Sequence, residues 1–226
     1  MPVTRPAALV APDAPIALEP AVTRFVSRGG DKLDGALHRF SVTVAGRRWL
    51  DAGASTGGFT DRLLQGGARA VAAVDVGYGQ LDWRLRNDER VVVLERTNVR
   101  NLTPEQLPWE PEAVVADLSF ISLRLVLPAL TSVARPDADH ILMVKPQFEV
   151  GRREAVPRGV VRDPQTWRST ILSVVEAAAS LGLGLVDAVV AAPRGPAGNR
   201  EFFVHLKPGW AGNREAVSRA VEGVGE

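Results

Sequence analysis

The stretch "RRWLDAGASTGGFTDRLL", residues 47–64, decides the fold. An apolar run ends at Asp51, three glycines follow between positions 53 and 58, and the pattern of a helix begins after them. Glycine has no Cβ, so it adopts unusual backbone angles and lets a ligand touch the main chain. The stretch therefore predicts a buried strand, then a glycine turn crossed by something small and flat, then a helix.

Outward from this stretch, strands and helices alternate along most of the chain. The strands are near-continuous runs of Val, Leu and Ala, which is typical of a parallel sheet covered by helices on both faces. Trp83 and Trp167 lie within helical patterns and are interpreted as packing residues. Strands are expected over residues 47–53, 70–77, 91–96, 112–119, 139–146, 182–193 and 200–208, and helices over 27–40, 57–67, 79–88, 121–134 and 164–182.

The last two predicted strands are joined only by "RGPAGN", residues 194–199. A connection of a few residues cannot make a parallel crossover, so these strands should form a hairpin with the final strand antiparallel to its neighbours. Five parallel strands closed by such a hairpin are the plan of the Rossmann-like methyltransferases. The expected fold class is thus α/β, a mostly parallel seven-stranded sheet with a C-terminal antiparallel hairpin strand and helices on both faces.

Composition limits the function classes. The chain has 226 residues, 46% of them hydrophobic, a net charge of +1 and no cysteine. This excludes disulfide scaffolding and thiol catalysis, and it argues against a strongly basic nucleic-acid binder, though not against a local basic patch. No low-charge stretch is long enough to span a bilayer, and no signal pattern opens the chain. We therefore expect a cytoplasmic protein with no membrane partner and no metal site.

The glycine turn and the ends of the next strands predict a cofactor site. Asp75 ends the second strand, 22 residues after Gly53, where a carboxylate accepts both hydroxyls of a ribose. Dinucleotides and S-adenosylmethionine both fit this much. The turn lacks the second glycine of G-x-G-x-x-G, which favours S-adenosylmethionine; a merely structural strand–helix turn stays open. In either case Ser55 and Thr56 are expected to cap the following helix. The expected cofactor-binding residues are Gly53, Ala54, Ser55, Thr56, Gly57, Gly58, Phe59, Asp75, Val76, Asn98, Val99 and Asp117.

Asn98 and Val99 follow the third strand. The amide of Asn98 both donates and accepts, so it suits an adenine edge, and Val99 would press on the ring. The alternative is that Thr97 and Asn98 only make a turn.

Three ionisable residues lie at strand ends that the predicted topology brings together. Asp117 ends the fourth strand, Lys145 ends the fifth, and Glu201 begins the last. An antiparallel strand begins at the edge where its parallel neighbours finish. If the hairpin inserts beside the fifth strand, the three groups meet at the cofactor edge on adjacent strands. A lysine partly desolvated there can take a proton from an alcohol as that alcohol attacks a methyl group. This apparatus suits a sugar hydroxyl, whereas the chain lacks the Asn/Asp-Pro-Pro-Tyr loop typical of nucleobase methylation.

Several segments, in order from about residue 25 to 207, closely resemble the TlyA (hemolysin A) family of ribosomal RNA methyltransferases, whose methyltransferase domain is of the FtsJ/RrmJ type. The segments are "VSRGGDKLDGAL", "LDAGASTGGFTDRLLQGGARAVAAVDVGYGQLDWRLRND", "ERTNVRNL", "DLSFISLRLVLPAL", "KPQFEVGR" and "GNREFF". The resemblance implies transfer of a methyl group from S-adenosylmethionine to the ribose 2′-oxygen of ribosomal RNA cytidines. It also implies a catalytic tetrad of Lys32, Asp117, Lys145 and Glu201, of which Lys32 comes from the resemblance alone.

Family members carry an S4-type RNA-binding domain of about sixty residues before "SRGG". Residues 1–24, rich in proline, look like a remnant of that domain or a linker from it, and residues 25–226 form the expected methyltransferase domain. The name hemolysin implies membrane lysis, but the sequence lacks an amphipathic or spanning segment of the required kind.

Arginines gather in loops near the expected active edge, and the guanidinium fork suits phosphates. Gln147 and Phe148, just beyond Lys145, are placed to flank a target nucleotide that is splayed out of folded RNA. The arginines are Arg28, Arg152, Arg153, Arg158, Arg162, Arg194 and Arg200, and the predicted RNA contacts among them are Arg28, Arg152, Arg153 and Arg200.

Two other function classes stay open. One is a nucleotide-dependent oxidoreductase, which the glycine spacing disfavours; the other is a non-catalytic RNA-binding or ribosome-assembly protein that keeps the fold. The expected partner is ribosomal RNA or a ribosomal subunit. The sequence leaves open which nucleotide is modified, whether naked RNA or an assembled subunit is the substrate, and whether the protein is a monomer or a weak dimer.

Overall fold

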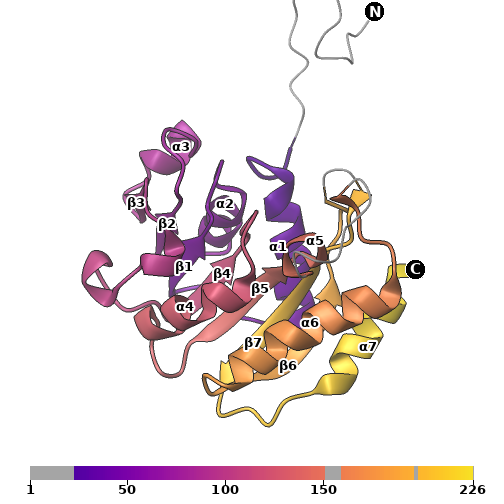
Figure 1. Cartoon of the computed structure of the whole chain (residues 1–226). Helices are drawn as coiled ribbons and strands as arrows, with labels where there is room; N and C mark the ends of the chain where they lie inside the picture. Colours follow the sequence, from indigo (N-terminus) through magenta and orange to yellow (C-terminus); the bar gives the residue numbers. More distant parts are fainter. Residues whose placement is uncertain (1–22, 151–158, 196–197, 226) are drawn as a thin grey trace, which may run out of the picture.

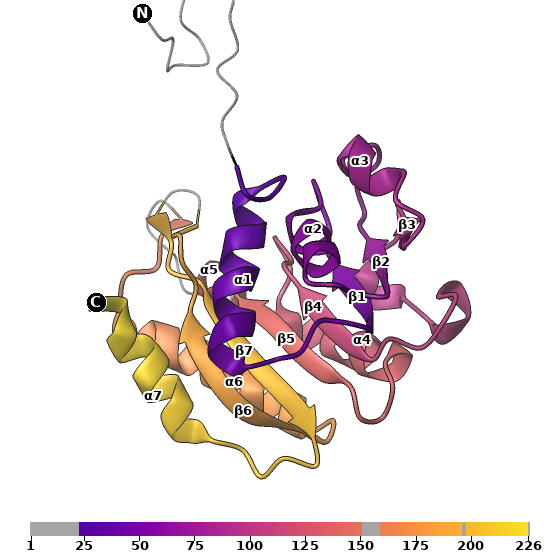
Figure 2. The same ribbon diagram turned by 180° about the vertical axis from the view of Figure 1, so that it is seen from behind.

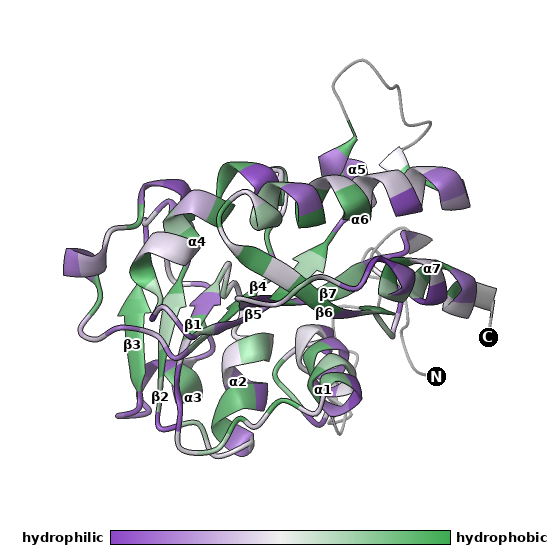
Figure 3. Cartoon of the chain, turned by 90° about the horizontal axis from the view of Figure 1, so that it is seen from below, coloured by the Kyte–Doolittle hydropathy of each residue, from purple (hydrophilic) through white to green (hydrophobic). Residues whose placement is uncertain are grey.

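The computed structural model describes residues 23–150, 159–195 and 198–225. A twisted sheet lies between two layers of helices (Figure 1, Figure 2). Seen along the layers, α1 and α2 cover one face and α4 and α6 the other, with apolar residues toward the sheet (Figure 3). The predicted arrangement of helices on both faces is confirmed.

The sheet has seven strands in the order β3-β2-β1-β4-β5-β7-β6. β1 to β5 pair in parallel, whereas β7 is antiparallel to both β5 and β6. The hairpin therefore inserts beside β5, as predicted. The strands are β1 Arg48–Ala52, β2 Ala70–Val74, β3 Val91–Leu94, β4 Ala113–Ala116, β5 Asp139–Val144, β6 Leu183–Val190 and β7 Phe202–Pro208.

The helices agree with the predicted pattern except in four segments, one of which is the short helix Pro146–Glu149 at the end of the strand expected over 139–146. The helix expected over 121–134 begins as a separate 3-10 turn, and the one expected over 79–88 shrinks to a single turn. A C-terminal helix that was not predicted follows β7. The α-helices are α1 Arg28–Phe40, α2 Gly58–Gln65, α3 Trp83–Arg86, α4 Leu127–Val133, α5 Pro146–Glu149, α6 Pro164–Ala179 and α7 Arg214–Glu222, and the 3-10 turns are η1 Val99–Asn101, η2 Pro104–Gln106, η3 Leu123–Leu125 and η6 Gly223–Gly225.

Alternate residues of each strand face the two layers. In β1, Leu50 belongs to the core under α4 and α6, while Trp49 belongs to the core under α1 and α2. Trp167 is buried on α6 as predicted. Trp83 is 71% exposed, so its interpretation as a packing residue is wrong. The single turn of α3 buries Leu85 and turns Trp83 outward.

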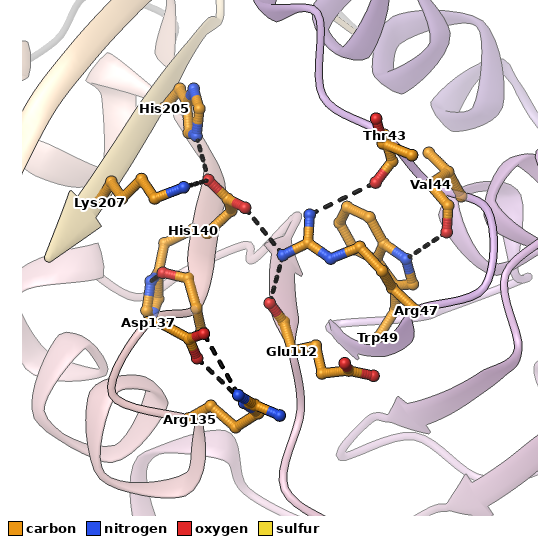
Figure 4. A network of polar contacts seen from close by, with 12 residues as sticks. Thr43, Val44, Arg47, Trp49, Glu112, Arg135, Asp137, His140, His205 and Lys207 are labelled. Atoms are coloured by element: carbon orange, nitrogen blue, oxygen red, sulfur yellow. Dashed lines mark hydrogen bonds and ion pairs between the residues drawn. The ribbon is translucent and has the colours of Figure 1, made fainter.

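The topology creates two opposite edges. We call the edge where β1 to β5 end the carboxyl edge, and the edge where they begin the amino edge. At the amino edge, the Asp139 carboxylate accepts bonds from Arg47 Nη2 at 2.8 Å and His205 Nε2 at 2.8 Å, with Lys207 Nζ at 3.5 Å (Figure 4). Arg47 Nη2 also donates to the Glu112 carbonyl. This network ties β1, β4, β5 and β7 together.

Candidate active site

The glycine turn after β1 is packed tightly from behind. Gly53 has φ +86°, and a Cβ there would lie 2.7 Å from the Asp117 carbonyl oxygen. Gly57 has φ +97°, and a Cβ there would lie 2.3 Å from Leu85 Cδ1. These glycines are thus required by the neighbouring loops as well as by any ligand that crosses the turn.

The predicted capping of α2 by Ser55 and Thr56 is wrong. The residue that precedes the helix is Gly57, which has no side chain to offer. Ser55 has φ +49°, a left-handed conformation that directs its backbone N–H to Asp75 Oδ2 at 2.8 Å. Asp75 Oδ1 accepts from the N–H of Gly77 at 2.7 Å. One carboxylate therefore holds the turns after β1 and β2, and its remaining lone pairs face the same edge.

Two adjoining cavities open at the carboxyl edge. The first, of about 460 Å³, is here called the cofactor cavity, and its size and mixed lining suit a small molecule. Its lining residues are Gly53, Ser55, Asp75, Val76, Gln80, Asn98, Val99, Asp117, Leu118, Ser119, Phe120, Ile121 and Val126.

The second cavity, of about 260 Å³, is here called the tetrad cavity and is the more polar of the two. Gly53, Ser55, Asp117 and Ser119 line both, so the two cavities share a wall. The residues lining the tetrad cavity are Ser27, Arg28, Gly29, Lys32, Gly53, Ala54, Ser55, Thr56, Gly58, Phe59, Asp117, Ser119, Lys145 and Glu201.

Asn98 and Val99 lie at the cofactor cavity, but part of the Asn98 side chain is used in the turn. Its Oδ1 accepts the N–H of Arg100 at 3.0 Å and so caps η1. Val99 is buried. Gly57, another predicted cofactor-binding residue, does not lie at the cofactor cavity. It packs beneath the glycine turn, against Leu81 and Leu85.

Lys145 lines the tetrad cavity and contacts two residues of the wall that the cavities share. Its Nζ donates to Ser119 Oγ at 3.0 Å and forms an ion pair with Asp117 Oδ1 at 2.5 Å. The contact with Asp117 has the distance of an ion pair but lacks hydrogen-bond alignment. Lys145 is only 9% exposed. Its ammonium is therefore held by two groups of the loop after β4.

Lys32 and Glu201 also line the tetrad cavity. Lys32 Nζ donates to Glu201 Oε2 at 2.5 Å, and both side chains are buried. The α1 helix makes this contact possible, since it starts at Arg28 with Ser27 as its cap and presents Lys32 one turn later. Four residues from four separate segments thus meet around one cavity.

Asp51 is a buried acid that the sequence reasoning did not assign to the site. Its side chain is 0% exposed, and its Oδ2 accepts from Thr60 Oγ1 at 2.6 Å. Within the described residues Oδ1 has no hydrogen-bond partner. Burial raises the pKa of Asp51 to about 7, and the nearby charges of Asp117 and Asp75 add to this against the bond from Thr60. The signal was present in the sequence, as an acid inside an otherwise apolar strand.

Phe120 is a second residue that the sequence reasoning missed. It is 90% exposed at the rim of the cofactor cavity and has φ +64°, a rare conformation for a bulky residue. Its ring lies 5.1 Å from that of Phe148 on α5. Gln147, the neighbour of Phe148, has a buried Oε1 with no partner among the described residues. No sequence pattern signals a phenylalanine in the left-handed conformation.

The arginines predicted to contact RNA lie in different surroundings. Arg28 is exposed and lines the tetrad cavity. Arg200 is half-buried, and its Nη2 donates to the Val224 carbonyl at 2.7 Å, so it fastens the C-terminal turn. Burial, together with the nearby charge of Arg194, lowers the pKa of Arg200. Arg162 and Arg194 are exposed, whereas Arg152, Arg153 and Arg158 lie outside the described residues.

Within the described part of the chain, no three His, Asp or Glu side chains come together as metal ligands. None of the helices built from residues 23–150, 159–195 and 198–225 is long and apolar enough to cross a membrane.

The fold and the site together define a methyltransferase. The sequence matches the FtsJ-like methyltransferase family over residues 25–208, and the chain belongs to that family. The fold is shared with an S-adenosylmethionine-dependent methyltransferase from Mesorhizobium loti at a TM-score of 0.57 and 14% identity, over 76% of this chain and 96% of that one.

More similar proteins are found within one branch of the family. The chain is 54% identical over 203 residues to the 16S/23S rRNA (cytidine-2′-O)-methyltransferase TlyA of Mycobacterium tuberculosis. The aligned region covers 87% of this chain and 76% of that protein. A solved structure of a Lactococcus lactis protein that carries the name hemolysin is 40% identical, with a TM-score of 0.84 over 90% of this chain and 99% of that one. The family resemblance read from the sequence is confirmed.

Proposed function

We propose that this chain transfers a methyl group from S-adenosylmethionine to a ribose 2′-hydroxyl of ribosomal RNA, at a cytidine. One observation carries the proposal: Lys145 lines the tetrad cavity, and its Nζ is held by Asp117 and Ser119, which line both cavities. A methyl donor in one cavity and a hydroxyl in the other would meet beside this amine.

The cofactor cavity fits S-adenosylmethionine by the chemistry of its lining. Asp75 offers carboxylate oxygens for ribose hydroxyls, Val99 offers an apolar surface for adenine, and the turn at Gly53 exposes backbone. When bound, the cofactor supplies an electrophilic methyl group attached to a sulfonium sulfur. That sulfur leaves as a neutral thioether.

The tetrad residues supply alignment and a proton acceptor. Lys145 first releases one ammonium proton to solvent, and its amine then takes the hydroxyl proton on Nζ while the ribose oxygen forms its bond to the methyl carbon and the carbon–sulfur bond breaks. Asp117 and Ser119 fix the direction of Nζ. Lys32 and Glu201 also line the tetrad cavity and hold the ribose in line with the methyl group. The products are a methyl ether on the ribose, the thioether left by the cofactor and one proton. No residue forms a covalent bond in the step.

An RNA substrate is supported by the surface around the cavities. Phe120 is exposed at the rim and its ring lies against that of the half-buried Phe148, and bases stack well on such rings. Arg28 at the mouth of the tetrad cavity is placed for a phosphate. The M. tuberculosis relative is named for cytidine-2′-O methylation of 16S and 23S rRNA. An enzyme of ribosomal RNA works where ribosomes are made, so we propose a cytoplasmic location.

The test is methyl transfer from radiolabelled S-adenosylmethionine to isolated ribosomal subunits and to free ribosomal RNA, followed by mapping of the modified sugar. We expect label in a cytidine ribose. Label only in a base would contradict the role of the tetrad. A binding titration with S-adenosylmethionine and with NAD separates the oxidoreductase alternative, since tight binding of NAD alone would exclude methyl transfer. Binding of the methyl donor and of RNA without any transfer would favour the non-catalytic alternative.

A further inference from the structure

Glu149 is a buried carboxylate that the proposed mechanism does not use. It ends α5, four residues after Lys145, and is 5% exposed. Its Oε2 accepts from Ser122 Oγ at 2.5 Å, and its Oε1 accepts from the N–H of Leu123 at 2.7 Å. Both oxygens thus accept hydrogen bonds from the loop that follows β4. In sequence the two donors come after Phe120, whereas Asp117 comes before it.

Arg124 extends these contacts to a third element. Its Nη2 donates to the Glu149 carbonyl at 3.0 Å, its Nε to Ser122 Oγ at 3.1 Å, and its Nη1 to Ser173 Oγ on α6 at 3.2 Å. We call Ser122, Arg124, Glu149 and Ser173 the loop clamp. It fastens the loop after β4 and the start of α5 to each other and to α6.

The two loops that the clamp joins carry the reacting and stacking groups. The loop after β4 carries Asp117, Ser119 and Phe120, and the segment after β5 carries Lys145 and Phe148. Between the loops, Lys145 reaches Asp117 and Ser119, and the Phe120 ring meets the Phe148 ring. The left-handed backbone of Phe120 persists only where its surroundings enforce it, and the clamp begins two residues later.

A buried carboxylate is an expensive way to pack two loops. Its desolvation has to be offset by hydrogen bonds, which are short and directional when the acceptor is charged. An apolar side chain would bury the same surface without setting the register of the loops. The choice of an acid with both oxygens engaged therefore points to alignment as its role.

We propose that Glu149 is a positioning residue for methyl transfer, whose carboxylate sets the separation of the two loops that carry Asp117, Phe120, Lys145 and Phe148. The proposal rests on the function proposed above. It assigns to Glu149 no contact with cofactor or substrate. Its effect reaches the reaction through the register of the amine against the hydroxyl and through the aromatic pair.

The first test is kinetic and uses Glu149→Gln, which keeps the size but turns one acceptor oxygen into a donor. We expect kcat/KM for ribosomal RNA to fall roughly ten- to a hundredfold, because small misplacements are costly in an in-line displacement. The dissociation constant of S-adenosylmethionine should change several-fold less than kcat/KM, since Glu149 itself does not line the cofactor cavity. The matched control is Glu176→Gln, an exposed residue of α6, which should leave both values unchanged.

The second test measures the aromatic pair without methyl transfer. Incorporation of 3-fluorophenylalanine labels the seven phenylalanines for ¹⁹F NMR, and Phe120→Leu and Phe148→Leu assign two resonances. We expect Glu149→Gln to shift and broaden these two resonances and to leave the resonance of buried Phe203 in place. A merely structural role would move all resonances or none.

The outcomes separate this inference from the proposed function. Failure of the unsubstituted protein to methylate any RNA overturns the proposed function and the role of Glu149 in it. An active protein in which Glu149→Gln keeps kcat/KM and both resonances overturns the role of Glu149 alone. If Glu149→Gln does not fold, Ser122→Ala decides, since it removes one bond of the clamp and should produce the same changes at about a third of their size.

Discussion

The two edges of the sheet hold similar charged groups, but these groups have different roles. At the amino edge, Asp139 accepts from Arg47 and His205 and pairs with Lys207, within a closed network. At the carboxyl edge, the tetrad residues pair two by two around a cavity. Clustered buried charge alone therefore does not identify a catalytic site. Access to a cavity distinguishes the two edges.

The acids of the two edges differ in how far they are satisfied, although His140 Nε2 and His205 Nδ1 at the amino edge also lack a partner among the described residues. Near the tetrad, Ser55 and Phe120 have left-handed backbones, and Asp51 Oδ1 has no partner among the described residues. At the amino edge, both oxygens of Asp139 are engaged. Strained backbone and half-satisfied acids tend to lie where a ligand completes the structure.

The largest difference between the edges should appear when a lysine is removed from each. We expect Lys145→Ala to lower the rate of methyl transfer at least about a hundredfold, because the proton acceptor is lost. Lys207→Ala should leave the rate within about twofold, since Lys207 is partly exposed and its ion pair with Asp139 lies at the amino edge. Single-turnover transfer to ribosomal RNA measures both. Binding of S-adenosylmethionine should survive in both variants, and transfer by Lys145→Ala at the parent rate would contradict the assigned role.

The second difference concerns stability. Lys32→Ala leaves the Glu201 carboxylate buried without its cation, so we expect the free energy of unfolding to fall by about 3 to 5 kcal/mol. Arg47→Ala leaves Asp139 with His205 and Lys207, so the loss should be about 1 to 2 kcal/mol. Urea unfolding measures both, and Lys32→Ala combined with Glu201→Gln should recover part of the first loss. Equal losses at the two edges would refute the contrast.

The third difference is a dependence on pH. The pKa of Asp51 rises from 3.8 to about 7 on folding, so its contribution to stability is complete below pH 3.8 and is lost as the pH rises through 7. Burial would raise the pKa of Asp139, but the bonds from His205 and Arg47 lower it overall, so its contribution is present above its unfolded pKa and is lost only in acid.

Neutral substitutions at these two acids test the signs. The free energy of unfolding of Asp51→Asn, relative to the parent protein, should rise by about 2 to 3 kcal/mol between pH 5 and pH 8. The relative value for Asp139→Asn should stay constant over that range, because its carboxylate is ionised throughout. Chemical unfolding at several pH values measures both, and a flat difference for Asp51→Asn would show that this acid is ionised in the folded protein.

The smallest expected effect concerns two left-handed serines. Ser41, at the end of α1, has φ +53°, and Ser55, in the glycine turn after β1, has φ +49°. Glycine at either position should raise the free energy of unfolding by about 0.5 to 1 kcal/mol, since it removes the strain. Only Ser55→Gly should weaken binding of S-adenosylmethionine, by about threefold, because the turn loses preorganisation. Thermal unfolding and a binding titration distinguish the two, and equal cofactor affinities would mean that the turn gains nothing from Ser55.

Much of the carboxyl edge was predictable because it depends on chain direction. The glycine turn marked the end of β1, and the short link before Glu201 forced a hairpin. Parallel strands end where an antiparallel neighbour begins, so Asp117, Lys145 and Glu201 had to share an edge once β7 lay beside β5. The capping of α2 by Ser55 and the packing of Trp83 were mispredicted, because both depend on local backbone angles that composition does not reveal.

The sequence by itself determined the alternation of strands and helices, the cofactor turn and the strand-end residues, because apolar periodicity and short connections act locally. Only the tertiary structure decided that Lys32 pairs with Glu201, 169 positions away, that Phe120 turns outward onto Phe148, and that Glu149 binds the neighbouring loop. These contacts depend on how distant segments pack at one edge of the sheet. Side-chain burial and hydrogen-bond geometry there arise from the whole fold and from no single stretch of it.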